Sequence, residues 1–233
     1  MKFRHELKYF INYQDYALIR SRLKSLLSFD ANVDSDGSYT VRSLYFDDYY
    51  NTAYNDKYTG TLNRTKYRIR TYNHSDKTIN LEKKNKRVQY NYKQTAPMTR
   101  ELVDDVLQGD YGSLFESPSN LLQVFYHECV SNVMRPRVVV DYEREPYIME
   151  AGDVRITFDK NIRAGVAGFD VFDAAMPMIE ALDPGLLIME VKFTEFLPSI
   201  IRKILPSKSA DYAAASKFIL CCDKTNHRRY SHY

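Results

Sequence analysis

The sequence predicts an α+β protein of one domain, in which many antiparallel strands carry their charges on a single face. Two patterns predict this class. Basic residues recur at every second position in several strand-like segments, and segments with apolar residues at helical spacing lie between them. A period of two places alternate side chains on the same face of a strand. Such strands, closed into a barrel with the charged faces inside, would form a basic tunnel suited to a metal-bound polyanion.

The first half of the chain predicts a helix followed by a series of strands. Asn12 can cap this helix, because Tyr16, Ile19 and Leu23 follow at helical spacing. A stretch rich in turn-forming residues, 34–38, then leads into the next strand. We expect a helix at residues 13–28 and strands at residues 2–9, 39–46, 64–73, 77–86 and 88–95.

The second half alternates helices with strands. The spacing of Leu122, Phe125 and Cys129 predicts a helix, and Pro136 marks the return to a strand. We expect helices at residues 99–107, 119–134, 198–205 and 209–222, and strands at residues 136–147, 154–163, 177–182 and 186–193. The domain is expected to span residues 1–222, with a frayed tail over residues 223–233.

The composition is that of an ordinary globular chain. The length of 233 residues is enough to bury a sizeable core. The net charge of +3 is too small to argue for nucleic acid binding. Cys129, Cys221 and Cys222 show neither a disulfide framework nor a metal-binding spacing. Because the sequence shows no signal-like opening and no apolar run long enough to span a membrane, we expect a cytoplasmic protein.

The alternating charges are the main functional signal. They comprise Arg4, Glu6 and Lys8; Lys66, Arg68 and Arg70; Glu82, Lys84 and Lys86; and Glu190 with Lys192. One such strand alone could be the solvated outer face of a sheet. Several together favour a binding site, because like charges on adjacent strands repel each other unless a ligand supplies the opposite charge. Lysine and arginine suit phosphate oxygens in particular.

Three glutamates share a strand face with a lysine two residues away: Glu6, Glu82 and Glu190. Each pair has two interpretations. It is either an ion pair across the sheet, or the glutamate is an oxygen ligand of Mg²⁺ or Mn²⁺, which usually take one or two carboxylates plus substrate phosphates. In the second interpretation the lysine binds the phosphate that the metal bridges.

Other nucleotide-binding and nucleophile motifs are missing from the sequence. It has no P-loop, no Gly-x-Gly-x-x-Gly and no Gly-x-Ser-x-Gly. The five histidines show no ligand spacing, so a zinc site is not expected. A nucleotide that binds this chain therefore does not bind through a P-loop or a Rossmann turn.

Eight short segments carry a family resemblance in the correct order along the chain: residues 4–9, 42–47, 66–72, 81–84, 142–144, 155–159, 189–193 and 216–218. Together they resemble the VTC domain, the polyphosphate polymerase branch of the triphosphate tunnel metalloenzymes (CYTH superfamily). The resemblance implies an eight-stranded antiparallel tunnel barrel with surrounding helices. It also implies transfer of the ATP γ-phosphate to a growing polyphosphate chain with Mn²⁺ or Mg²⁺. ATP and polyphosphate or inorganic phosphate would then be the partners, without nucleic acid.

The resemblance also assigns residues. By motif, the phosphate contacts would be Lys8, Arg68, Arg70, Lys84, Lys93, Arg144, Arg155 and Lys217, and Glu190 would bind the metal. We expect all of these cations except Lys93 to act in catalysis, and Lys93 to bind substrate. The alternating charges add Arg4, Lys66, Lys86 and Lys192 as substrate contacts, and Glu82 and Glu6 as metal ligands.

Two further functions remain open. Arg4 stands where the wider superfamily has the first Glu of Glu-x-Glu-x-Lys, which favours the VTC branch over the hydrolase branch. A triphosphate or tripolyphosphate hydrolase is still an alternative, because water and phosphate can attack along the same line. A non-catalytic polyphosphate-binding module is the other alternative. Glu190 argues against it, since a pure anion binder has no use for a carboxylate among phosphates.

Two structural expectations follow from these assignments. The charged residues of the strands should point into one cavity, while Tyr67, Ile69, Leu187 and Val191 pack outward against helices. The last helix should point Lys217 at phosphate. The alternative is an exposed helical lysine. If Lys217 points at phosphate, we expect Lys217→Ala to impair ATP turnover strongly while changing stability by no more than about 0.5 kcal/mol, as surface changes do.

Overall fold

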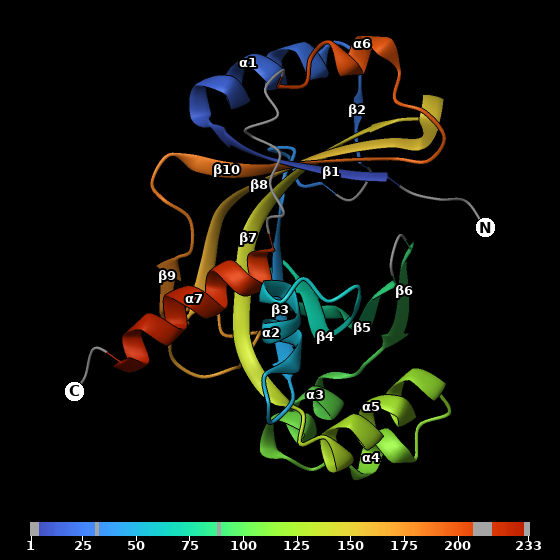
Figure 1. Ribbon diagram of the computed structural model, residues 1–233, viewed down its shortest axis with the longest axis vertical. Helices are drawn as coiled ribbons and strands as arrows, with labels where there is room; N and C mark the ends of the chain where they lie inside the picture. Colours follow the sequence, from blue (N-terminus) through green and yellow to red (C-terminus); the bar gives the residue numbers. More distant parts are fainter. Residues whose placement is uncertain (1–4, 31–32, 88–89, 207–215, 231–233) are drawn as a thin grey trace. The chain divides into compact units, whose positions relative to one another are not determined.

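The computed structural model describes residues 5–30, 33–87, 90–206 and 216–230 (Figure 1). The contacts within the chain group it into two compact units. Unit 1 comprises Met1–Thr40, Tyr142–Ile162 and Glu180–Lys217; unit 2 comprises Val41–Asp141, Arg163–Ile179 and Phe218–Tyr233. Each unit has its own apolar cluster.

Strands dominate the described part of the chain. The strands are β1 (His5–Asn12), β2 (Ser28–Phe29), β3 (Tyr39–Asp47), β4 (Asn63–Tyr72), β5 (Ser75–Arg87), β6 (Tyr90–Pro97), β7 (Arg135–Met149), β8 (Val154–Gly165), β9 (Met178–Glu180) and β10 (Leu186–Phe193). The helices are α1 (Tyr13–Lys24), α2 (Thr52–Tyr58), α3 (Arg100–Gln108), α4 (Gly112–Phe115), α5 (Asn120–Ser131), α6 (Ser199–Arg202) and α7 (Lys217–Tyr230), with a 3₁₀ turn, η1 (Ala151–Asp153).

The strands belong to one sheet with the hydrogen-bonded order β1-β10-β8-β7-β3-β4-β5-β6. Strand β2 pairs with β7, and β9 pairs with β8. The pairs β1/β10, β10/β8, β2/β7, β3/β4, β4/β5 and β5/β6 are antiparallel. Together with the helices, this sheet confirms the predicted α+β class. Over the described residues the sheet has ten strands rather than eight. No pairing within the described ranges joins β6 to β1, so the closed eight-stranded barrel is not confirmed.

In unit 1, helices α1 and α6 lie side by side over strands β1, β8 and β10 (Figure 1). Leu187 and Val191 of β10 are fully buried, and they share an apolar cluster with Leu23 of α1 and Ile201 of α6. This is the outward packing that the sequence predicts for β10. Because side chains alternate along a strand, the residues between these apolar positions lie on the opposite face of the sheet.

Helix α1 begins where the sequence predicts and ends earlier. The side chain of Asn12 accepts a hydrogen bond of 2.8 Å from the backbone N–H of Asp15, as an N-cap does. The helix stops at Lys24 instead of continuing to residue 28, because the chain enters β2 and pairs with β7. The ring of Phe29 packs 4.9 Å from that of Tyr147, so strand pairing and ring contact override the helical spacing here.

In unit 2, helices α3, α4 and α5 cover the apolar face of strands β3 to β6 (Figure 1). Tyr67 and Ile69 of β4 are buried in this cluster, and the ring of Tyr67 lies 5.3 Å from that of Phe125 in α5. Thr99 caps α3 by accepting a hydrogen bond of 3.2 Å from Leu102 N–H. Gly109 ends the helix with a φ of 86°, which glycine adopts readily.

The last helix differs from the prediction. Helix α7 continues to Tyr230, beyond the predicted end of the helix at residue 222. The division into a domain and a tail stays a prediction. The carboxylate of Asp223 accepts hydrogen bonds from the hydroxyls of Tyr54, at 2.6 Å, and Tyr58, at 2.8 Å, which holds the helix to α2. The predicted helical residues 209–215 lie outside the described ranges. None of the described helices combines the length and apolar character needed to cross a membrane.

Candidate functional site

Three strands of unit 1 bring charged side chains together. In the antiparallel register, Glu190 of β10 lies opposite Lys8 of β1 on one side and opposite Thr157 of β8 on the other. Two residues further along β10, Lys192 lies opposite Glu6 of β1. Directly opposite residues in paired strands have their side chains on the same face. The face turned away from the apolar cluster is therefore charged.

Glu190 is the centre of this charged face. Its Oε1 lies 3.2 Å from Lys8 Nζ and 3.5 Å from Lys217 Nζ. Its Oε2 lies 3.0 Å from Lys192 Nζ and 3.8 Å from Arg144 Nη2. Because the residue is only 5% exposed, these contacts are little screened by water. Four of the predicted phosphate-binding cations thus surround one buried carboxylate.

Asp159 is a member of this cluster that the sequence reasoning missed. It is fully buried and accepts a forked pair of hydrogen bonds from Arg144, at 2.7 and 2.8 Å. Its Oδ2 also lies 2.5 Å from Lys217 Nζ. Asp159 follows Arg155 and Thr157 at alternate positions of β8, and this period of two is the signal that could have found it. Asp159 positions two of the cations that reach Glu190.

Burial and ion pairing oppose each other in this cluster. Burial raises the pKa of Glu190, but the surrounding lysines and arginine outweigh it and hold that pKa well below the usual carboxyl range. Burial lowers the pKa of Lys217 and of Lys8, yet their carboxylate partners outweigh it and raise both pKa values. For Lys192 burial dominates and lowers the pKa to about 8. Lys192 is therefore the member of the cluster that loses its proton most readily.

Two carboxylates of this face converge on one ammonium group. Lys8 Nζ lies 3.0 Å from Glu6 Oε1 and 3.2 Å from Glu190 Oε1. Among the described residues, no three His, Cys, Asp or Glu side chains form a group that could hold a metal ion. Mg²⁺ and Mn²⁺ often use one or two carboxylates and complete their coordination with water and phosphate oxygens. In the structure the ammonium group of Lys8 pairs with both carboxylates, and the metal role of Glu6 and Glu190 stays a prediction.

Arg155 lies on the same face but pairs elsewhere. Its Nη2 lies 2.9 Å from Asp30 Oδ2 and donates to the Tyr39 hydroxyl at 3.2 Å. The structure does not bring Arg155 into the group around Glu190. Arg4, the other predicted contact from this part of the chain, lies outside the described residues.

A second charged face lies on the strands of unit 2, with Glu82 at its centre. Arg68 Nε donates to Glu82 Oε2 at 2.7 Å and Lys93 Nζ donates to Oε1 at 2.7 Å, while Arg70 Nη1 lies 3.9 Å away. Arg68 also donates to the Tyr45 hydroxyl at 2.7 Å. Burial raises the pKa of Glu82, but the cations outweigh it and lower the pKa to about 2. The ion-pair interpretation of Glu82 is what the structure shows, and its metal role stays a prediction.

The other predicted cations of unit 2 are Lys66, Lys84 and Lys86. In the strand register, Lys84 lies opposite Lys66 and opposite Lys93, while Lys86 lies opposite Arg64. Lys66 Nζ lies 4.5 Å from the centre of the Phe218 ring. Burial, followed by the charge of Arg64, lowers the pKa of Lys66 to about 7. The lysines of this face are therefore crowded by like charges.

The structure thus gathers the predicted residues into two groups. The group in unit 1 is Glu6, Lys8, Arg144, Glu190, Lys192 and Lys217. The group in unit 2 is Arg68, Arg70, Glu82 and Lys93, with Lys66, Lys84 and Lys86 on the same strands. The expectation that both groups line one cavity stays a prediction.

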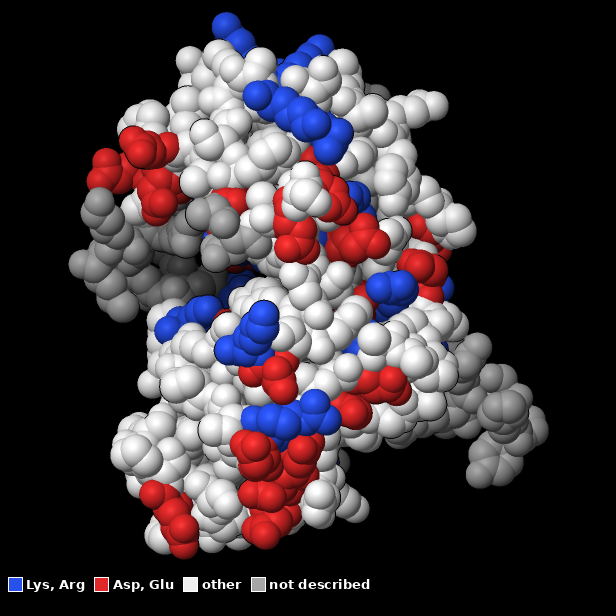
Figure 2. All heavy atoms as spheres, turned by 180° about the vertical axis from the view of Figure 1, so that it is seen from behind, with Lys and Arg blue, Asp and Glu red and all other residues white. Residues whose placement is uncertain are grey.

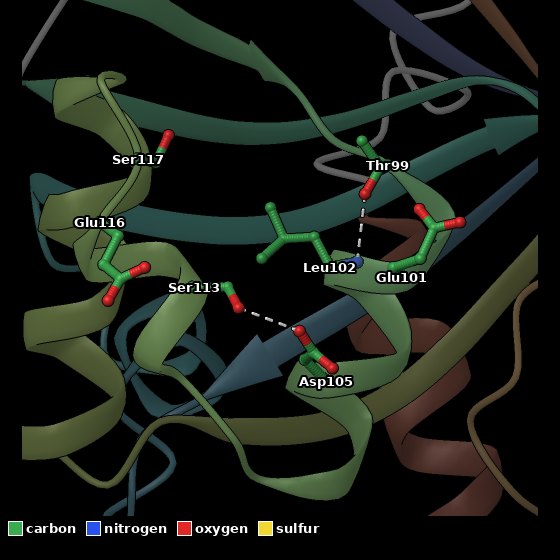
Figure 3. A pocket seen from close by; sticks show the side chains of 7 residues that line it. All are labelled: Thr99, Glu101, Leu102, Asp105, Ser113, Glu116 and Ser117. Carbon is green, nitrogen blue, oxygen red and sulfur yellow. Dashed lines mark hydrogen bonds between the residues drawn. The ribbon is translucent and has the colours of Figure 1, made fainter.

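A hollow of about 330 Å³ lies on the helical layer of unit 2. Figure 2 shows acidic side chains gathered at this helical end of the unit. Figure 3 shows the hollow between α3 and α4, with Ser113 hydrogen-bonded to Asp105. It is lined by Thr99, Glu101, Leu102, Asp105, Ser113, Glu116 and Ser117. Its carboxylates would repel a polyanion, so this hollow does not suit the expected substrate.

The structure is an antiparallel, sheet-rich α+β fold whose strands carry charged residues on one face and apolar, helix-covered residues on the other. The family model of the VTC domain matches residues 3–226. The chain therefore belongs to the VTC domain family, as the eight sequence segments indicate. A search of curated proteins finds no match.

Several solved structures are similar to this chain, among them the following two. One is a protein from Hippeastrum, proposed to be an adenylyl cyclase and reported with a dominant triphosphatase activity. It aligns with a TM-score of 0.56 at 13% identity, over 96% of this chain and 96% of that chain. The other is a proposed adenylate cyclase from Bacillus halodurans, with a TM-score of 0.50 at 9% identity, over 100% of this chain and 91% of that chain. At these identities the likeness shows the fold alone.

Proposed function

We propose that this protein is a metal-dependent polyphosphate polymerase, which transfers the γ-phosphate of ATP to the end of a growing polyphosphate chain. The observation that carries the proposal is the ring of four cations around the buried carboxylate of Glu190. Phosphoryl transfer depends on cations that neutralise phosphate oxygens and on a carboxylate that holds a metal. Membership of the VTC domain family supports the same reaction.

The reaction needs position and charge rather than covalent help from the protein. The terminal phosphate of the polyphosphate chain is already anionic, so its oxygen attacks the γ-phosphorus without a general base. A P–O bond forms between this oxygen and the γ-phosphorus, while the bond from the γ-phosphorus to the β,γ-bridging oxygen breaks. ADP leaves with the electron pair of that bond, and the chain grows by one phosphate.

The residues of unit 1 have separate roles in this proposal. Lys8, Lys192 and Lys217 bind phosphate oxygens and balance the charge that accumulates during transfer. Asp159 keeps Arg144 and Lys217 in position through its buried contacts with both. Glu190 and Glu6 would hold Mn²⁺ or Mg²⁺, which supplies Lewis-acid charge to phosphate oxygens when bound.

The residues of unit 2 supply guanidinium groups whose positions are fixed by their neighbours. Arg68 is held by Glu82 and the Tyr45 hydroxyl, and Arg70 Nε donates to Ser43 Oγ at 3.2 Å. A guanidinium fork held in one orientation can bind two phosphate oxygens at once, with less loss of side-chain entropy. We assign Arg68 and Arg70 to phosphate binding on this basis.

One observation favours a second function. The Hippeastrum protein that shares the fold has a dominant triphosphatase activity. If water rather than a phosphate chain attacks along the same line, the same cations and metal would support hydrolysis of ATP or tripolyphosphate. The two functions therefore differ in the attacking group and in the product.

The products of one incubation separate the functions. Purified protein is incubated with ATP and Mn²⁺, and ADP, orthophosphate and polyphosphate chain length are measured. ADP together with long polyphosphate supports the polymerase, and orthophosphate as the sole phosphate product supports the hydrolase. Glu101→Gln, a change of an exposed glutamate on α3, is the matched control and should act like wild type. Binding of tripolyphosphate without any metal-dependent turnover would instead indicate a binding module.

A further inference from the structure

The hydroxyl of Thr157 is buried and has no hydrogen-bond partner among the described residues. The residue is 2% exposed. On the same strand, two residues earlier, Arg155 Nε is also buried without a partner in the described ranges. A buried hydroxyl that makes no hydrogen bond destabilises the fold, because the cost of removing it from water is not compensated. Valine has nearly the same shape and would avoid this cost, so the hydroxyl calls for an explanation.

The strand register places both groups beside the charged cluster of unit 1. Thr157 is the residue directly opposite Glu190, and Arg155 is the residue directly opposite Lys192. Their neighbours Ile156 and Phe158 are fully buried in the apolar cluster on the other face of the sheet. Thr157 and Arg155 therefore share the charged face, at consecutive alternate positions of β8.

The hydrogen-bonding chemistry of Thr157 and Arg155 indicates which class of ligand could satisfy them. Arg155 Nε–H can only donate a hydrogen bond, and it cannot bind a metal. The Thr157 hydroxyl can donate as well. Arg155 lies opposite Lys192, and Thr157 lies opposite Glu190, which four cations surround. Positive charge therefore predominates around both groups, so the ligand that satisfies them carries negative charge and several acceptor oxygens. A chain of phosphates has these properties at regular intervals, whereas a metal ion would leave the guanidinium unsatisfied.

We propose that Thr157 donates its hydroxyl hydrogen to an oxygen of the bound phosphate chain beside Glu190, and that Arg155 Nε donates to another oxygen of that chain. Lys8 and Lys192 turn toward Glu190, but phosphate oxygens attract the same ammonium groups. Because lysine side chains have many rotamers, these ammonium groups can shift from Glu190 toward phosphate. This inference rests on the proposed function and adds Thr157 to it as a substrate-positioning residue.

Three variants test the inference. Thr157→Val removes the hydroxyl, and Thr157→Ser keeps it. Thr71→Val is the matched control, because Thr71 is also fully buried with an unpartnered hydroxyl, on the face of β4 that holds Tyr67 and Ile69. Binding of tripolyphosphate to each purified protein is measured by calorimetry, with a chelator and again with Mn²⁺, together with the thermal midpoint.

We expect Thr157→Val to weaken tripolyphosphate binding about tenfold or more, with and without Mn²⁺, since a hydrogen bond to a charged group is lost. Its thermal midpoint should equal or exceed that of wild type, because an unsatisfied hydroxyl is removed. Thr157→Ser should bind within about threefold of wild type, and Thr71→Val should bind like wild type. This pattern would show that the hydroxyl serves the ligand rather than the fold.

Other outcomes overturn the inference or the proposed function separately. If Thr157→Val binds tripolyphosphate as tightly as wild type, the inference is wrong while the polymerase assignment is unaffected. If the defect occurs only with Mn²⁺, Thr157 serves the metal and the inference is also wrong. If the defect is present in both conditions but wild type makes no polyphosphate, the inference holds and the polymerase assignment fails. If wild type does not bind tripolyphosphate at all, both are wrong.

Discussion

The ammonium group of Lys217 lies 2.5 Å from the buried carboxylate of Asp159. Lys217 is the first residue of α7, and Asp159 lies in β8. The contact from Lys217 to Glu190 is longer, at 3.5 Å. Asp159 also binds Arg144. The position of two cations next to Glu190 therefore depends on a carboxylate that is not itself expected to touch substrate.

This contact changes the expectation for Lys217→Ala. The side chain of Lys217 is 11% exposed and its partner Asp159 is fully buried, so the residue is not a surface lysine. Removing one partner of a buried ion pair costs about 3–5 kcal/mol, because the other charge is left uncompensated. We therefore expect Lys217→Ala to lose ATP turnover and also to lower the urea midpoint of unfolding, in place of the small change that the sequence suggests.

The exposed Lys203 of the same unit provides the control. Lys203→Ala should change the unfolding free energy by no more than about 0.5 kcal/mol and leave turnover intact. Equal urea midpoints for the two variants would show that the Lys217–Asp159 contact contributes no stability. An unchanged rate in Lys217→Ala would remove Lys217 from the site.

The predicted metal role of Glu190 gives a second test. Glu190→Gln should abolish Mn²⁺-dependent turnover while tripolyphosphate binding, measured without metal, stays equal or becomes tighter. The reason is that the substitution removes a negative charge from among the phosphate-binding lysines. Glu180→Gln, an exposed acid of the same unit, should leave both quantities unchanged. Full turnover in Glu190→Gln would rule out Glu190 as a metal ligand.

The sequence predicts the charged faces well because they depend on local periodicity. Strand β10 has the predicted bounds, 186–193, and the alternation of Glu190 and Lys192 with apolar residues is visible in the sequence. Contacts between distant segments could not be predicted in this way. The Lys217–Asp159 pair and the hydrogen bond from Tyr54 to Asp223, 169 residues away in the chain, depend on tertiary packing. Asp223 lies in α7, one residue beyond the predicted end of this helix.

The ion pairs of Glu82 predict a dependence of stability on acid. The folded-state pKa of Glu82 is lowered from 4.5 to about 2. A carboxyl group with a lowered folded-state pKa stabilises the fold above its unfolded pKa, and this contribution is lost as the pH falls through the folded value. The unfolding free energy of wild type should therefore exceed that of Glu82→Gln at neutral pH. The difference should shrink as the pH falls from 4.5 to about 2, as measured by urea titrations. A difference that stays constant across this interval would contradict the pairing.

The environment of Lys66 predicts that anion binding weakens as the pH rises. Burial, then the charge of Arg64, lower its pKa from 10.5 to about 7; Lys84 acts in the same direction, while Cys222 and Asp47 oppose it. Above pH 7, Lys66 is mostly neutral in the free protein, and it has to take up a proton before its charged ammonium group can bind phosphate. This proton uptake becomes less favourable as the pH rises, so the affinity for phosphate falls. Stability changes in the opposite direction. Because the fold disfavours the charged lysine, the unfolding free energy should rise from about pH 7 to pH 10.5.

Lys66→Met isolates this contribution, because it keeps the length of the side chain and removes its charge. The affinity ratio of wild type to Lys66→Met for tripolyphosphate should fall between pH 7 and pH 9, on the order of tenfold per pH unit at most. Taking the ratio cancels the ionisation of the ligand itself and of every other group that the two proteins share. Calorimetry at several pH values gives both affinities. A ratio independent of pH would mean that Lys66 stays charged throughout this range or does not contact the anion.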